Sequence, residues 1–167
     1  YLLLIGGAEN KSDGCKILEK VVELSGRREA CLTVITVATA KPERVGEDYV
    51  KLFSRLGVED VVALDIKTRQ EAKKDYIAER IQKSTGSFFT GGDQLRITSL
   101  LGGSRVYHAL HDAYKKGVVL CGTSAGASVM SDTMIVEGGG NETPGGSLIN
   151  MAPGMGLLEE VVVDQHF

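Results

Sequence analysis

The chain has 167 residues and a formal net charge of −3, with 43% hydrophobic and 25% charged residues. These values are ordinary for one globular domain that is long enough to bury a core. The absence of a basic block argues against a nucleic-acid partner. Because the sequence has no apolar run of the ~18 residues that a membrane span requires, a membrane partner is also excluded.

The three cysteines, Cys15, Cys31 and Cys121, are widely spaced and odd in number. They do not form the pattern of a disulfide framework or a metal cluster, so we expect a reducing, cytoplasmic environment with no metal and no cofactor. The chain begins at Tyr1 within an apolar stretch and stops at Phe167 just after another. We therefore expect a single domain over residues 1–167 that is incomplete at its C-terminus, and a secreted form stays compatible with the sequence.

Short apolar runs alternate with amphipathic segments along the first 131 residues. Strands are expected at residues 1–5, 32–37, 61–64, 87–90 and 118–121, and helices at 16–24, 43–56, 70–82, 96–101, 105–116 and 125–131. This alternation predicts an α/β fold with a doubly wound, mostly parallel sheet.

The pattern changes after residue 131. An antiparallel strand is expected at 134–137 and a last strand at 161–163, and the glycine-rich stretch "GGGNETPGG" at 138–146 separates them. Glycine loses much conformational freedom on ordering, so we expect this stretch to be a weakly ordered surface loop near the site that could act as a lid.

Three of the expected strands end in small residues: Gly6-Gly7, Gly91-Gly92 and Gly122. In parallel sheets, ligands bind beyond the carboxyl ends of the strands. We therefore expect these glycines to gather at one edge of the sheet and to form a site there.

Ser124 lies in the sequence "GTSAGAS", between an expected strand and an expected helix. A serine on such a sharp turn is exposed for nucleophilic attack, and its neighbours must be small because the turn is crowded; Gly122 and Gly126 meet that need. The amide of Ala125 would then face a developing oxyanion. The plainer alternative is a serine that caps a helix.

A serine nucleophile requires a base, and His166 follows the expected strand at 161–163. His108 and His111 lie three residues apart on an expected helix, where no carboxylate or cysteine completes a metal set, so we expect a solvated face there. Cys121 lies within an apolar strand and is expected in the core rather than at the chemistry.

The turn at Gly91-Gly92 also has two compatible interpretations. Asp93 could cap the helix that follows, and the amide of Gly92 could be a second oxyanion donor.

Several motifs in order along the chain together resemble the cyanophycinases, a family of serine peptidases related to aspartyl dipeptidase (peptidase E). They are "GGAE" at 6–9, "FFTGGDQLRITSLLGGS" at 88–104, "GTSAGAS" at 122–128, "PGMGLL" at 153–158 and "VVVDQHF" at 161–167. The resemblance implies the flavodoxin-like sheet of the class I glutamine amidotransferases, in which a cysteine occupies the position of Ser124.

The resemblance also implies a role for individual residues. The nucleophile falls on Ser124, the general base on His166, the oxyanion amides on Gly92 and Ala125, and the substrate-binding residues on Gln94, Asp164 and Gln165. The family has a glutamate after the histidine that orients the imidazole, and this acid is expected beyond Phe167.

The implied substrate is cyanophycin, a polyaspartate with arginine on each β-carboxyl, and the implied products are β-aspartyl-arginine dipeptides. Asp164 could accept a bidentate guanidinium bond, and in an extended strand it would share the side of His166. A homodimer is compatible with the sequence.

Three alternatives stay open. An α-aspartyl dipeptidase of the same fold would release aspartate from dipeptides. An α/β-hydrolase esterase would need an acid between Ser124 and His166, where Asp132 and Glu137 are very close to the serine and no HGGG-type loop occurs. A catalytically inactive binding module would keep the fold without the chemistry.

Overall fold

The central element of the computed structural model is a five-stranded sheet in which every pair of neighbouring strands is parallel. The structure describes residues 1–12, 14–138 and 149–166. The strand order is β1-β5-β4-β2-β3. The strands are β1 (Leu2–Ile5), β2 (Cys31–Ile35), β3 (Asp60–Leu64), β4 (Gly86–Phe89) and β5 (Val119–Thr123). The predicted parallel α/β sheet is confirmed.

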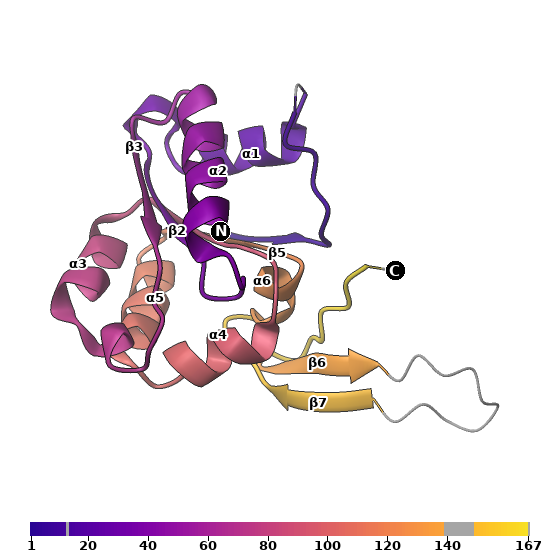
Figure 1. The fold of residues 1–167 in the computed structure, drawn as a ribbon. Coiled ribbons are helices and arrows are strands. Elements are labelled where there is room, and N and C mark those ends of the chain that lie inside the picture. The colour runs from indigo at the N-terminus through magenta and orange to yellow at the C-terminus, as the bar shows by residue number, and fades with distance from the viewer. Residues whose placement is uncertain (13, 139–148, 167) are drawn as a thin grey trace.

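Helices cover both faces of the sheet (Figure 1). One face packs against α1 (Lys16–Leu24) and α2 (Pro42–Arg55), with the short 3₁₀ turn η1 (Arg27–Glu29) after α1. The other face packs against α3 (Asp75–Lys83), α4 (Gln94–Leu101), α5 (Arg105–Lys115) and α6 (Ala125–Ser128). The doubly wound arrangement follows from these two separate cores.

Alternation along the strands divides the side chains between the two cores. Leu32 and Val34 of β2 pack with α1 and α2, whereas Ile35 packs with the helices on the opposite face. Phe88 and Phe89 of β4 likewise point to opposite faces. The first core is centred on aromatic rings: Phe53 of α2 meets Phe88 edge-on, with 5.5 Å between ring centroids.

The expected helix at 70–82 is two elements. Residues Glu71–Lys73 form a 3₁₀ turn, η2, and α3 begins only at Asp75, because Lys74 has an extended backbone (φ −73°, ψ 131°). The amphipathic period continued across this break, so periodicity alone could not reveal it.

The C-terminal part differs most from the prediction. The expected antiparallel strand at 134–137 is present as β6 (Thr133–Gly138). Its partner β7 (Ile149–Pro153) was not predicted, and the hairpin that the two strands form extends beyond α4 and α6 (Figure 1). The predicted strand at 161–163 is wrong. Its side chains at Val161 and Val162 are exposed, and this stretch has irregular backbone instead of a sheet ladder. The proposed lid at 138–146 lies, after Gly138, outside the described residues.

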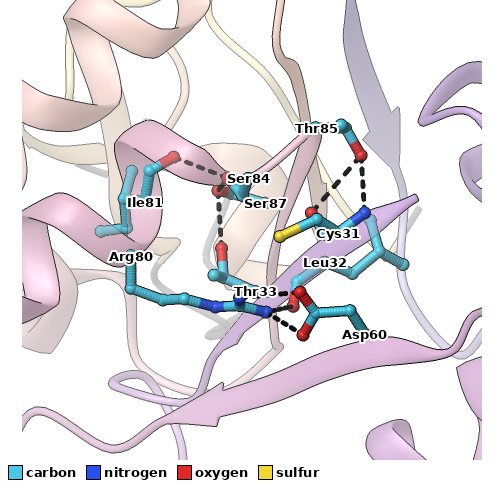
Figure 2. Close-up of polar contacts among 9 residues, drawn as sticks. All are labelled: Cys31, Leu32, Thr33, Asp60, Arg80, Ile81, Ser84, Thr85 and Ser87. Carbon is cyan, nitrogen blue, oxygen red and sulfur yellow. Dashed lines mark hydrogen bonds and ion pairs between the residues drawn. The ribbon is translucent and has the colours of Figure 1, made fainter. Parts of the chain in front are cut away.

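Polar side chains gather at the amino-terminal end of β2, β3 and β4, away from the strand ends that carry Ser124 (Figure 2). Arg80 of α3 donates to both carboxylate oxygens of Asp60, at 2.9 and 2.6 Å. Deeper in the fold, the buried hydroxyls of Thr33 and Ser87 are 2.8 Å apart, and Ser84 donates to the carbonyl of Ile81 at 2.7 Å. The Arg80–Asp60 pair ties α3 to β3, while the Thr33–Ser87 contact joins β2 to β4.

Within the described ranges, the helices are all too short or too polar to cross a bilayer.

The aromatic contact of Phe53 in the core and the exposed Arg80–Asp60 ion pair should differ greatly in their effect on stability. Phe53 is fully buried, so Phe53→Ala should lower the free energy of unfolding by about 3–5 kcal/mol through lost burial and a cavity. Asp60 is largely exposed, so Asp60→Asn should cost less than about 1 kcal/mol. Urea unfolding of the full-length protein measures both, and an equal cost would contradict this account of the core.

Candidate active site

The carboxyl ends of three adjacent strands meet at the candidate site. β5 lies between β1 and β4, with Ile5 opposite Thr123 and Phe89 opposite Gly122. The residues that follow these strands therefore come together, as the sequence predicted: the Gly6-Gly7 turn, the Gly91-Gly92 turn and Ser124. A Cβ added at Gly91 would lie only 3.3 Å from the Cβ of Ser124.

Ser124 is held on a strained turn between β5 and α6. Its backbone has φ 53° and ψ −119°, which is rare for a residue with a side chain. Its amide donates to the carbonyl of Ile5 at 2.9 Å. A Cβ at Gly122 would collide with the carbonyl of Gly126, and a Cβ at Gly126 would lie 2.8 Å from the Cβ of Phe89. The turn is therefore possible only with glycine on both sides.

His166 reaches Ser124 from the far end of the chain. Its Nε2 lies 2.7 Å from the Oγ of Ser124, although 42 residues separate the two. The expected proximity is therefore present, but it is not delivered by a strand: residues 161–166 are irregular and His166 has φ 58°. Its amide instead donates to the carbonyl of Gly6 at 3.3 Å.

The imidazole of His166 lies against Gly7, a contact that sequence reasoning missed. A Cβ at Gly7 would be 2.7 Å from Nε2 and 3.0 Å from Nδ1, and the φ of +120° also favours glycine. At Gly6, by contrast, a Cβ would meet nothing within 4 Å. The second glycine of the "GGAE" motif thus leaves the space that the ring occupies.

Of the two amides expected to face an oxyanion, that of Ala125 directly follows Ser124, and that of Gly92 follows Gly91, which packs against Ser124. Gly92 is exposed in a turn with φ +145°, packed so closely on the loop after β2 that a Cβ would be 2.5 Å from the carbonyl carbon of Ala38. Ala125 is the first residue of α6, where helices leave amide groups without intrahelical partners. The expected cap is also present: Asp93 accepts from the amide of Leu95 at 2.8 Å.

The three expected substrate-binding residues have different surroundings. Gln94 donates from Nε2 to the carbonyl of Ile135 at 2.8 Å and so anchors the β6–β7 hairpin. Asp164 is exposed and accepts from the amide of Gln165 at 2.8 Å. The Oε1 of Gln165 is buried without a hydrogen-bond partner among the described residues. Residues 161–166 are not in a strand, so strand geometry does not place Asp164 on the same side as His166, as the sequence had led us to expect.

Glu9 is a site residue that sequence reasoning missed. Its side chain is only 3% exposed, and it accepts hydrogen bonds from the hydroxyls of Tyr49 and Thr123, the residue just before Ser124. Burial opposes ionisation, but these hydrogen bonds and the nearby ammonium of Lys11 together lower the pKa of Glu9 below its ordinary value of 4.5. A buried carboxylate therefore stays ionised beside Ser124.

The structure also shows the surroundings of Cys121 and of the two histidines on α5. Cys121 is fully buried, and burial together with the charge of Glu9 raises the pKa of its thiol, in agreement with its expected place in the core. His111 does not lie on a solvated face: its Nε2 is 2.8 Å from the carbonyl of Met155, and its ring packs on Tyr107. It joins α5 to the segment after β7, whereas His108 is exposed as expected.

An open cavity of about 580 Å³ lies in front of the Ser124–His166 pair. Its wall includes both members of the pair together with Glu9, Lys11, Tyr49 and Gly91. A half-buried serine that lines a cavity and lies next to an imidazole can perform acyl transfer on a small ligand.

The sequence matches the model of the protein family described as Peptidase family S51 over residues 2–167. A cyanophycinase from Trichormus variabilis is 41% identical over 167 residues, which cover 99% of this chain and 56% of the relative. Cyanophycinases from Geminocystis herdmanii and Synechococcus elongatus are 42% and 39% identical, with 61% and 52% of their lengths covered. The chain thus spans little more than half the length of these curated relatives.

Solved structures show the same fold at lower sequence identity. A peptidase from an acI-B1 actinobacterium has a TM-score of 0.76 at 23% identity, covering 99% of this chain and 68% of that one. A protein from Listeria monocytogenes described as a candidate peptidase E has a TM-score of 0.59 at 21% identity, covering 79% and 62%.

The space at Gly7 gives a direct test of the site. Gly7→Ala should displace the imidazole of His166 and slow the labelling of Ser124 by a fluorophosphonate reagent by about tenfold or more, because a misplaced base is costly. Gly6→Ala is the matched control and should label at nearly the original rate, since its added methyl meets nothing and its carbonyl is retained. Equal rates for the two variants would contradict the assigned geometry.

The lowered pKa of Glu9 predicts a defined dependence of stability on pH. The ionised carboxylate stabilises the fold above about pH 4.5, its unfolded value, and this contribution is lost as the pH falls through the lower folded pKa. The difference in unfolding free energy between the original chain and Glu9→Gln should therefore be constant from pH 7 to about pH 5 and shrink in more acid solution.

Denaturant titrations across this pH range measure the difference. The exposed Glu47 on α2 supplies the control, and Glu47→Gln should change stability by no more than about 0.5 kcal/mol throughout. A Glu9→Gln difference that grew on acidification would overturn the assignment.

Proposed function

The chain belongs to peptidase family S51, and we propose that it hydrolyses cyanophycin to β-aspartyl-arginine dipeptides through an acyl-enzyme on Ser124. The observation that carries the proposal is the 2.7 Å contact between Ser124 Oγ and His166 Nε2 on a strained, glycine-bounded turn. The family and the geometry support the same chemistry by independent routes.

The proposed reaction begins with the hydroxyl of Ser124. Its Oγ attacks the carbonyl carbon of the scissile amide while His166 Nε2 takes the hydroxyl proton. The negative charge that develops on the carbonyl oxygen is stabilised by the amides of Gly92 and Ala125. The imidazolium then donates the proton to the leaving nitrogen, and the carbon–nitrogen bond breaks to leave an ester on Ser124.

The second half of the reaction restores the serine. Water attacks the ester carbonyl while His166 accepts its proton, and the same two amides stabilise the second tetrahedral intermediate. Return of the proton to the Oγ of Ser124 releases the acid product. The strained backbone of Ser124 keeps the Oγ in position for both attacks, so little reorganisation is required between the two steps.

The proposed substrate follows from sequence similarity to the cyanophycinases, at 39–42% identity over nearly the whole chain. An α-aspartyl dipeptidase is the competing candidate, because structures with peptidase E and general peptidase descriptions share the fold. The relatives' greater length makes the full-length protein the proper material for every assay.

The proposal is tested by product analysis. The full-length protein should convert cyanophycin to β-aspartyl-arginine, identified by mass spectrometry, and Ser124→Ala should reduce kcat by at least about 10³-fold while the circular dichroism spectrum is kept. Release of free aspartate from Asp-X dipeptides, with no attack on the polymer, would favour the dipeptidase. Failure of any substrate, together with no fluorophosphonate labelling at Ser124, would favour an inactive binding module.

A further inference from the structure

We propose that the carboxylate of Glu9 and the ring of Tyr49 form a binding position for a cationic group of the substrate, and that the ammonium of Lys11 occupies this position in the unliganded chain. The inference rests on the proposed function and deepens it, because it assigns the recognition of the substrate's guanidinium group to residues that the sequence motifs did not identify.

The acceptor capacity of Glu9 is only partly used inside the fold. A carboxylate offers about four acceptor positions; the hydroxyls of Tyr49 and Thr123 take two of them, and the backbone amide of Glu9 takes another. The Nζ of Lys11 lies 3.6 Å from Oε1, which is an ion pair without a short hydrogen bond. Glu9 also forms part of the cavity wall. A charged donor that enters the cavity can therefore bind an ionised carboxylate that is already desolvated.

Tyr49 supplies the second half of the position. The Nζ of Lys11 lies 4.3 Å from the centroid of the Tyr49 ring, within the range of a cation–π contact. The ring itself is fixed, because its hydroxyl donates to Glu9 and its centroid lies 4.8 Å from that of Phe88 in the core. A rigid aromatic face next to a buried carboxylate is a suitable surface for a planar guanidinium, which stacks as well as donates.

Lys11 can leave this position at low cost. Its side chain is 51% exposed, and an ion pair with so much solvent contact contributes little to stability. Its backbone is held separately, because Arg55 of α2 donates from Nη2 to the carbonyl of Lys11 at 2.7 Å. The flexible ammonium can thus swing into solvent while the loop stays in place.

The position is in reach of the chemistry. Glu9, Lys11 and Tyr49 line the same cavity as Ser124 and His166. A ligand whose carbonyl group lies at Ser124 can therefore contact Glu9 with its side chain. Asp164, the acid that the sequence favoured for this role, is exposed, and it is not among the described residues that form this wall. The geometry favours Glu9 over Asp164 as the contact to arginine.

The test is a binding experiment in the full-length Ser124→Ala protein, which cannot turn the ligand over. Calorimetry would compare β-aspartyl-arginine with β-aspartyl-citrulline, whose side chain has a similar shape but a neutral ureido group. The parent should bind the arginine ligand about tenfold more tightly, since charge-assisted bonds are stronger than neutral ones. Glu9→Gln should reduce this ratio to about twofold or less, because its amide carries no charge.

A second variant tests the occupancy by Lys11 without touching the buried hydrogen bonds. Lys11→Met removes the competing ammonium, so it should tighten binding of the arginine ligand by about threefold or more and leave the citrulline ligand unchanged. Asp48→Asn, which alters an exposed acid next to Tyr49 on α2, is the matched control and should keep the parent ratio.

Each contrary result overturns a defined part of the inference. A preference for arginine that survives Glu9→Gln but is lost in Asp164→Asn would assign the contact to Asp164. Weaker arginine binding in Lys11→Met would make Lys11 a ligand-binding group instead of a competitor. No preference in the parent would reject the cation position altogether. All three results are independent of polymer hydrolysis, whose failure would reject the proposed function and not this binding position.

Discussion

Ser124 can hold its strained backbone only because the surrounding chain approaches it without side chains. The carbonyl of Gly126 lies where a Cβ of Gly122 would be, and β4 fills the space beside Gly126. Strain of this kind costs on the order of 1–3 kcal/mol and persists only where the neighbouring structure enforces it. The parallel pairing of β1, β5 and β4 supplies that enforcement, since Ser124 is bonded through its amide to the end of β1.

The same packing explains how an irregular segment can hold the imidazole of His166 next to Ser124. His166 has no strand to hold it, yet its amide is bonded to Gly6 and its ring rests on Gly7. The turn after β1 therefore positions His166, while the turn after β5 positions Ser124. Because β1 and β5 are adjacent, any displacement of one turn relative to the other changes the Ser124–His166 distance directly.

The loop after β1 also brings a charged group, the carboxylate of Glu9, to the candidate site. Glu9 is bonded to Thr123 and Tyr49, so one carboxylate links this loop to β5 and α2. Burial of an ionised group is costly unless hydrogen bonds compensate, and both hydroxyls do so here. The negative charge of Glu9 close to Ser124 favours cationic ligands in the cavity, in agreement with the proposed arginine-bearing substrate.

The sequence by itself determined the parallel α/β sheet, the gathering of glycine turns at one edge and the Ser124 turn, because periodicity and the short motif "GTSAGAS" are local signals. The choice of His166 as the partner of Ser124 rested instead on the family resemblance and on a strand that the structure does not contain. Only the tertiary structure decided how His166 arrives, why Gly7 must be glycine and that Glu9 faces the cavity while Asp164 does not. These features depend on contacts between segments 40 or more residues apart, such as Tyr49 with Glu9 and Thr123 with Glu9. A hydrophobic pattern records which side of an element is buried, but it contains no information on which polar groups meet there.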